Sequence, residues 1–271
     1  MKRSLIETHA HLNFPDFQND LDEVIKSSIK NGVNKIICVS ANVAHSIKAI
    51  EIAKKYPSVV YASVGIHPHQ TDPNNKDSIE EQIKQLKKLA SNKEVVAIGE
   101  CGLDFSETPH PENNRSQKDQ IFLFEKQIEL ALSLNLPVLV HSRKAFDEVL
   151  EILKKNYHAS KEKLTGVFHC YSGSKSDIKK VEAIGFYFGL DGNLTYDLGL
   201  QNVAKLIPLE KILLETDSPF LTPQPYRGLR NEPKNVKIIA EFLAQLKGLP
   251  LNQIVETINK NTHAAFFGKT R

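Results

Sequence analysis

The sequence predicts an α/β protein built as a (β/α)8 TIM barrel, and three observations lead to this fold class. Short β-rich runs alternate with amphipathic helical stretches along almost the whole chain, which is the pattern of a parallel sheet with crossover helices. The alternation yields eight strand candidates and at least eight helices, which favours a closed barrel over an open sheet. Residues able to bind a metal occur at the ends of several strands, where the sites of such barrels gather.

The expected elements follow one another in order. The strand candidates are residues 5–9, 35–39, 59–65, 95–99, 138–141, 166–169, 186–189 and 212–215. Helical patterns occupy 21–30, 78–89, 117–134, 145–155, 177–184 and 236–246, and a further helix follows over 251–267. Four glycines, at positions 185, 189, 192 and 199, interrupt the seventh unit. We therefore expect residues 1–271 to form one barrel domain with an extra C-terminal helix.

Composition and charge exclude several classes of protein. The chain has 271 residues, of which 41% are hydrophobic and 25% charged, as in an ordinary globular domain. Its formal net charge of +3 is too small to indicate nucleic-acid binding by itself, and no apolar run approaches the roughly 20 residues of a membrane span. The first residues contain no signal-peptide core, and the three scattered cysteines form no CxxC pair. These features predict a cytoplasmic protein without membrane attachment or an obligate protein partner.

Six residues of metal-binding type share one setting. His9 and His11 lie two apart at the end of the first strand candidate, so their side chains share a face. The other four stand at the ends of later strand candidates: Glu100, His141, His169 and Asp217. Each has an ordinary alternative: Glu100 in a barrel ion pair, His141 as a core histidine, Asp217 as a turn cap, and the HxH pair alone is a weak signal. Their recurrence at equivalent strand ends favours a joint metal site.

Four imidazoles and two carboxylates exceed what a single tetrahedral zinc ion requires. They suit two divalent ions about 3.5–4 Å apart, with Glu100 as the bridge because a carboxylate can give one oxygen to each ion. His9, His11 and Asp217 then complete one ion, and His141 and His169 the other. A water molecule held there would lose a proton near neutral pH and become a nucleophile. The ligand types admit magnesium, manganese or zinc.

The residues around these positions resemble the TatD family of metal-dependent deoxyribonucleases, within the amidohydrolase-like barrels. The matching motifs are ETHAHLN (7–13), VGIHPH (64–69), IGECGLDF (98–105), VHSR (140–143), FHCYSG (168–173), LETDSP (214–219) and PYRGLRNEP (225–233). The resemblance places the family's binuclear site on the same six residues and implies magnesium-supported 3′-to-5′ exonuclease activity. One departure concerns Glu7, where the family more often has Asp, and it bears on the support of the first metal.

Five further residues are candidates for substrate contacts and proton transfer. Arg143, Arg227 and Arg230 could hold phosphate oxygens, since barrels often bind phosphate with the loops after strands seven and eight. The alternative for the last two is loop structure, for example pairing with Glu232. His67 could contact the scissile phosphate or protonate the leaving oxygen, or simply be hydrogen-bonded near Pro68.

Tyr171 lies two residues after His169, just past a candidate metal ligand, and its ring could stack on a terminal base. Ordinary packing at the rim explains this tyrosine equally well.

The sequence thus predicts a metal-dependent hydrolase acting on ester bonds, namely a deoxyribonuclease that removes nucleotides from single-stranded DNA or chain ends. Glu100, Asp217 and His67 are the expected catalytic residues, with Asp217 helping to take the proton of the attacking water. The alternative is an amide or ester hydrolase, such as an aminoacyl-ester or lactone hydrolase, because the same pair of ions can attack a carbonyl group. A non-catalytic metal-binding barrel fits less well, since structural metal sites are closed to water.

Overall fold

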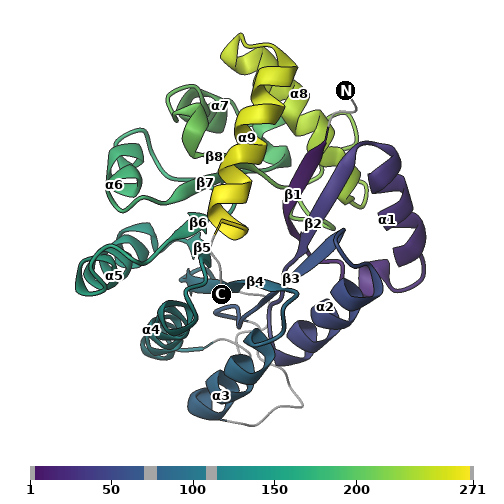
Figure 1. The fold of residues 1–271 in the computed structure, drawn as a ribbon. Helices are drawn as coiled ribbons and strands as arrows, with labels where there is room; N and C mark the ends of the chain where they lie inside the picture. Colours follow the sequence, from purple (N-terminus) through teal and green to yellow (C-terminus); the bar gives the residue numbers. More distant parts are fainter. Residues whose placement is uncertain (1–3, 70–77, 108–114, 269–271) are drawn as a thin grey trace.

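The protein is described by a computed structural model that covers residues 4–69, 78–107 and 115–268. Its eight strands form one parallel sheet in sequence order, each pairing with the next. They are β1 (Leu5–Ala10), β2 (Val33–Cys38), β3 (Val60–Val64), β4 (Val95–Asp104), β5 (Val138–Arg143), β6 (Gly166–Phe168), β7 (Tyr187–Leu190) and β8 (Ile212–Leu214). Figure 1 shows the strands as a ring with helices outside them. The predicted (β/α)8 TIM barrel is confirmed.

The helices follow the strands in the expected alternation. They are α1 (Leu21–Lys30), α2 (Val43–Lys55), α3 (Ile79–Ala90), α4 (Gln117–Leu134), α5 (Phe146–Ala159), α6 (Asp177–Ala183), α7 (Leu198–Ala204), α8 (Val236–Lys247) and α9 (Leu251–Phe266). Short 3-10 turns are η1 (Pro15–Phe17), η3 (Gly192–Thr195), η4 (Leu209–Lys211) and η5 (Pro233–Asn235). Within the described ranges, no helix combines the length and the apolar character needed to span a membrane.

Local side chains set several helix ends. The hydroxyl of Ser78 accepts the N–H of Glu81 at the start of α3, and Ser116 accepts that of Asp119 at the start of α4. Each of these caps satisfies a backbone donor that has no partner within its helix. At the C-terminal end of α8, Gly248 has φ +66°, a left-handed conformation that glycine adopts without steric cost.

Backbone contacts between the first and last strands close the barrel. Ala10 and Ser218 form a parallel bridge, the N–H of Asp217 donates to the carbonyl of His9 at 2.8 Å, and the N–H of His11 donates to Ser218 at 2.8 Å. These contacts bring the two ends of the sheet together at its C-terminal edge. The seam between β1 and β8 is therefore also the place where three of the expected metal ligands meet.

Two apolar layers hold the barrel. One lies between the strands and the surrounding helices, and the other contains strand side chains such as Ile37, Leu139 and Leu213 together with Ala265 and Phe266 of α9. In Figure 1, α9 lies across the view of the strand ring. Its C-terminal end thus contributes to the inner apolar layer, which explains why a helix after the eighth repeat is apolar on one side.

One strand differs from its predicted bounds in a way that matters for the site. We expected the fourth strand to end at residue 99 with Glu100 just beyond it. Instead β4 continues to Asp104, because its second half pairs with β5 through Cys101–Val140 and Gly102–His141 among others. Glu100 is therefore a buried residue inside a strand, at the register shift between Ile98 and Cys101.

Candidate metal centre

The six expected ligands converge at the C-terminal end of the strands. His9 lies in β1, Glu100 in β4 and His141 in β5, while the other three follow β1, β6 and β8: His11, His169 and Asp217. Five of the eight β/α units thus contribute a residue to one region, although these residues lie up to about 200 positions apart in the sequence. Parallel strands bring such distant residues together because all of their carboxyl ends lie at the same edge.

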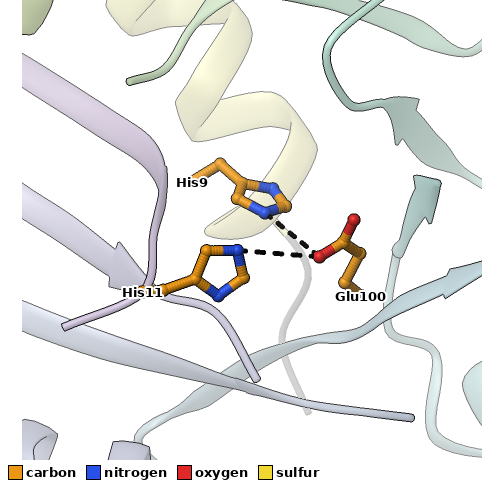
Figure 2. Close-up of side chains that lie close together, drawn as sticks. All are labelled: His9, His11 and Glu100. Atoms are coloured by element: carbon orange, nitrogen blue, oxygen red, sulfur yellow. Dashed lines mark ion pairs between the residues drawn. The ribbon is translucent and has the colours of Figure 1, made fainter. Parts of the chain in front are cut away.

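The first group of donor atoms surrounds a common point. Nε2 of His9 lies 3.6 Å from Oε2 of Glu100 and 3.7 Å from Oδ1 of Asp217, and Nε2 of His11 lies 3.7 and 3.3 Å from the same two oxygens. Figure 2 shows both imidazoles directed at one oxygen of Glu100. Metal bonds of about 2.1 Å in a tetrahedral site place ligand atoms roughly 3.4 Å apart, so these separations suit a single cation.

The second oxygen of Glu100 faces a second group. Oε1 lies 2.7 Å from Nδ1 of His141 and 3.7 Å from Nε2 of His169. His9 and His11 with Glu100 form one cluster able to hold a cation, and Glu100 with His141 and His169 forms another. Glu100 thus gives one oxygen to each group, as expected for a bridging carboxylate.

The protonation states of these groups suit metal binding. Burial lowers the pKa of His9, as does the ring of His169 stacked on it with centroids 3.6 Å apart, so His9 keeps a free lone pair. Burial alone would raise the pKa of Glu100, but His67, His141 and the other imidazoles outweigh it and lower the pKa well below its usual value. Of these groups, His9 is therefore neutral and Glu100 ionised, as a metal ligand of each type requires.

One buried residue tests directly whether a cation fits. Both ring nitrogens of His9 lack a hydrogen-bond partner among the described residues, although the side chain is fully buried. An unpaired buried polar group is costly, and few native side chains remain so. A cation at the donor atoms around Nε2 would satisfy one of the two nitrogens, so the residues present fit the expected metal.

Two carboxylates that the sequence analysis missed hold the ligating rings. Oε1 of Glu215 lies 2.9 Å from Nδ1 of His169, and Oδ2 of Asp104 lies 3.3 Å from Nε2 of His141. Burial alone would lower the pKa of His141, but Asp104 and Glu100 outweigh it and raise the pKa to about 9. Metal-bound histidines commonly hold such carboxylates on their other nitrogen. The sequence signal that could have identified them was their position: Glu215 lies two residues before Asp217, and Asp104 lies four residues after Glu100.

Glu7 supports the backbone beneath the centre. Its Oε1 accepts the N–H of His9 at 2.7 Å and the N–H of Thr216 at 3.0 Å, so the side chain links β1 to the segment after β8. Burial raises the pKa of this carboxyl well above its usual value, although the two backbone hydrogen bonds oppose the change. Glu7 therefore positions the backbone segments that carry the proposed metal ligands His9 and Asp217.

His67 lies beside the second group of donors. Its Nδ1 accepts the N–H of His69 at 3.2 Å, so the ring proton resides on Nε2, which lies 3.9 Å from Oε1 of Glu100. Burial and the nearby His141 lower the pKa of His67 to about 3, so the ring is neutral. His67, Asp104 and His141 also form a group able to hold a cation.

The structure places the expected substrate residues in different settings. Arg143 ends β5 with an exposed side chain. Arg227 lies over the ring of Tyr196 at 4.3 Å, and Arg230 donates to both oxygens of Asp20 at 2.9 and 2.6 Å. The two arginines after β8 therefore make the loop contacts that were their alternative interpretation, and Arg143 is the one of the three that is exposed at a strand end.

Tyr171 is buried, whereas base stacking would require an accessible face of its ring. Its side chain is only 3% exposed, packs edge-on against Phe188 with centroids 4.8 Å apart, and donates its hydroxyl to the carbonyl of Ser174. A ring buried in this way offers no face to a base, so the packing alternative describes this residue correctly.

Converging buried imidazoles and carboxylates at the mouth of a (β/α)8 barrel define the chain as a barrel protein of the metal-binding hydrolase type. The sequence matches the family of TatD related DNase over residues 6–267. It is 35% identical over 264 residues to the uncharacterized metal-dependent hydrolase YabD of Bacillus subtilis (97% of this chain, 98% of that protein). It is 33% identical over 267 residues to human deoxyribonuclease TATDN3, covering 97% of this chain and 94% of that protein.

A solved structure agrees with these relatives. The TatD homologue YjjV of Escherichia coli superposes with a TM-score of 0.86 and 28% sequence identity, over 98% of this chain and 99% of that one. The chain therefore belongs to the TatD family of metal-dependent hydrolases.

Proposed function

We propose that the protein is a deoxyribonuclease that hydrolyses DNA phosphodiester bonds with two divalent ions, as a 3′-to-5′ exonuclease on single-stranded or terminal DNA. The observation that carries the proposal is the shared position of Glu100, whose Oε2 faces the imidazoles of β1 and whose Oε1 faces His141 and His169. Two ions held in this way can stabilise the attacking and the leaving oxygen of an in-line displacement. The human relative's name, deoxyribonuclease, supports DNA as the substrate.

Bound divalent ions would lower the pKa of a water molecule and neutralise charge on the phosphoryl oxygens. The remaining roles fall to the chain itself. Asp217 stays ionised, since His169 and the other histidines outweigh the effect of burial and lower its pKa, so its carboxylate can accept the proton of the attacking water. Nε2–H of His67 can donate to the leaving oxygen or to a phosphoryl oxygen. Arg143 can attract the phosphate chain from its exposed position.

The ions are expected to be magnesium, manganese or zinc, because carboxylate favours the first two and imidazole the last. We also infer a cytoplasmic setting, because the three cysteines are free thiols and such thiols are typical of a reducing compartment.

The test uses the metal-stripped protein with end-labelled single-stranded DNA, to which magnesium, manganese or zinc is added back in turn. A ladder that shortens from the 3′ end, appears only with metal and is lost in Glu100→Ala supports the proposal. Exposed Glu151, whose side chain is 74% accessible, provides a matched control as Glu151→Gln. Intact DNA under every metal, with metal demonstrably bound, contradicts the proposal and favours hydrolysis of an amide or ester bond.

A further inference from the structure

Phe220 is an exposed aromatic residue at the edge of the metal centre. It lies three residues after Asp217 on the loop that follows β8, and the residue is 49% accessible. Its ring centroid lies 6.3 Å from that of His11, whose Nε2 is 3.3 Å from Oδ1 of Asp217. A large apolar side chain thus faces solvent directly beside two of the proposed metal ligands.

A second aromatic ring extends this surface beneath His11. Phe14 stacks on His11 with centroids 4.4 Å apart and an interplanar angle of 25°, and it meets Phe220 edge-on at 6.2 Å. Phe14 also lies 4.8 Å from the ring of His45 in α2. The ring of Phe220 is therefore supported from below by an aromatic cluster that is continuous with the centre.

The backbone holds Phe220 in this exposed position. Its N–H donates to the carbonyl of Asp217 at 2.8 Å, and its carbonyl accepts from Nδ2 of Asn231 at 2.7 Å. Asn231 is fully buried, and its own N–H donates to the carbonyl of Pro219. Hydrogen bonds on both sides fix the ring relative to Asp217, so its accessible face belongs to an ordered loop.

We propose that Phe220, supported by Phe14, stacks on the nucleobase that adjoins the scissile phosphate. The inference rests on the proposed phosphodiesterase function and deepens it. A single sugar joins a base to its phosphate, so a phosphate at the donor atoms of His11 and Asp217 brings the attached base to the neighbouring aromatic face. Stacking accepts every base, because each has a π-face, and it orients the chain end without reading its sequence.

The test compares Phe220→Leu, which keeps an apolar side chain but removes the π-face, with Phe220→Trp, which enlarges it. Leu206→Ala is the matched control, because Leu206 is 56% exposed just after α7. The substrates are a single-stranded oligonucleotide with a base on its terminal sugar and the same oligonucleotide with a base-free terminal sugar. We expect Phe220→Leu to lower kcat/KM roughly 5- to 100-fold on the first substrate only, and Phe220→Trp to keep it. Leu206→Ala should behave as the wild type on both.

Fluorescence of a terminal 2-aminopurine, placed at the 3′ or the 5′ end in two separate oligonucleotides, reports stacking without turnover. Quenching by the metal-loaded wild type that Phe220→Leu loses and Phe220→Trp retains supports the inference, even if the DNA is not cut. Equal losses on both substrates, or quenching unchanged in Phe220→Leu, overturn it. Failure of the wild type to cut DNA with any metal counts instead against the proposed function, so the two outcomes are separate.

Discussion

Oε1 of Glu215 lies within hydrogen-bond distance of Nδ1 of His169, at 2.9 Å, and the same oxygen accepts the backbone N–H of Cys170 at 2.6 Å. Glu215 is only 1% exposed, so water does not compete for these contacts. The pair fixes both the tilt of the imidazole and the nitrogen that it presents to Glu100. Glu215 therefore acts on the centre through the orientation of His169.

Replacing Glu215 by Gln should weaken metal binding. The substitution keeps the size of the side chain but removes the charge that orients His169, and loss of such a partner typically reduces metal affinity about 10- to 100-fold. Competition with a chromophoric chelator measures the change, with Glu151→Gln as the exposed control. Affinity equal to that of the wild type would show that the ring is held without the carboxylate.

Gly189→Ala should produce the same defect from the neighbouring strand. A Cβ on Gly189 would lie 2.5 Å from Oε2 of Glu215, closer than real contacts allow. Since Oε1 is held by His169 and Cys170, the carboxylate can move only by giving up those contacts. We expect metal affinity to fall as in Glu215→Gln, and the double variant to be little worse than either single one. Fully additive losses would mean that the two positions act separately.

Replacing Arg230 should lower stability, whereas replacing Arg143 should lower activity. Arg230→Ala removes a pair of hydrogen bonds to Asp20 and the packing of the guanidinium over Phe17, so unfolding in urea should become easier by about 1 kcal/mol. Arg143→Ala should instead lower DNA cleavage about tenfold and flatten its dependence on salt, because an exposed cation near the centre attracts phosphate. A stability loss confined to Arg143→Ala would contradict both assignments.

Asp191 should make stability depend on pH. Burial raises its pKa to about 7 from a usual value of 3.8, although hydrogen bonds with Cys170 and the N–H of Asn193 oppose the change. Between about pH 4 and 7 the folded protein keeps a proton that the unfolded chain has lost, so this group lowers stability as pH rises through that window. Asp191→Asn should remove roughly 2–4 kcal/mol of this dependence.

Urea unfolding at about pH 4.5 and pH 7.5, with chelator present, measures the Asp191 effect, and exposed Asp147→Asn is the control. If the difference between the two pH values were the same in Asp191→Asn and the wild type, the carboxyl would be ionised in the fold throughout.

The barrel could be predicted because its strands are continuous apolar runs and its helices carry clear periodicity, so β8 and α4 lie close to their expected bounds. The convergence of the six residues could be predicted because each of them repeats the same position relative to a strand. Asp104 and Glu215 could not be assigned, because their partners are fixed only by the packing of neighbouring strands. A carboxylate near a strand end looks the same in sequence whether it faces a ligand or solvent.

The burial of Tyr171, which agrees with one of its two interpretations, has a local cause. In an extended strand, residues two apart share a face, so an extended backbone would direct Tyr171 to the same side as His169. Cys170 between them has φ +45°, a left-handed conformation that turns the chain, and the tyrosine ring enters the core instead. Phe220 was overlooked because its exposure follows from backbone contacts in an irregular loop, where no periodic pattern exists.

The seam between β1 and β8 gives metal binding a second consequence. Glu7 and Thr216, which are joined there, lie 209 positions apart, and His9, His11 and Asp217 flank the same junction. A cation shared by these side chains would act as a cross-link between the two ends of the sheet, and it would close a long loop of the chain. Chelation should therefore speed hydrogen–deuterium exchange first at the amides of His11 and Asp217, while β3 to β6 stay protected. The ion would then stabilise the closed barrel in addition to taking part in the reaction.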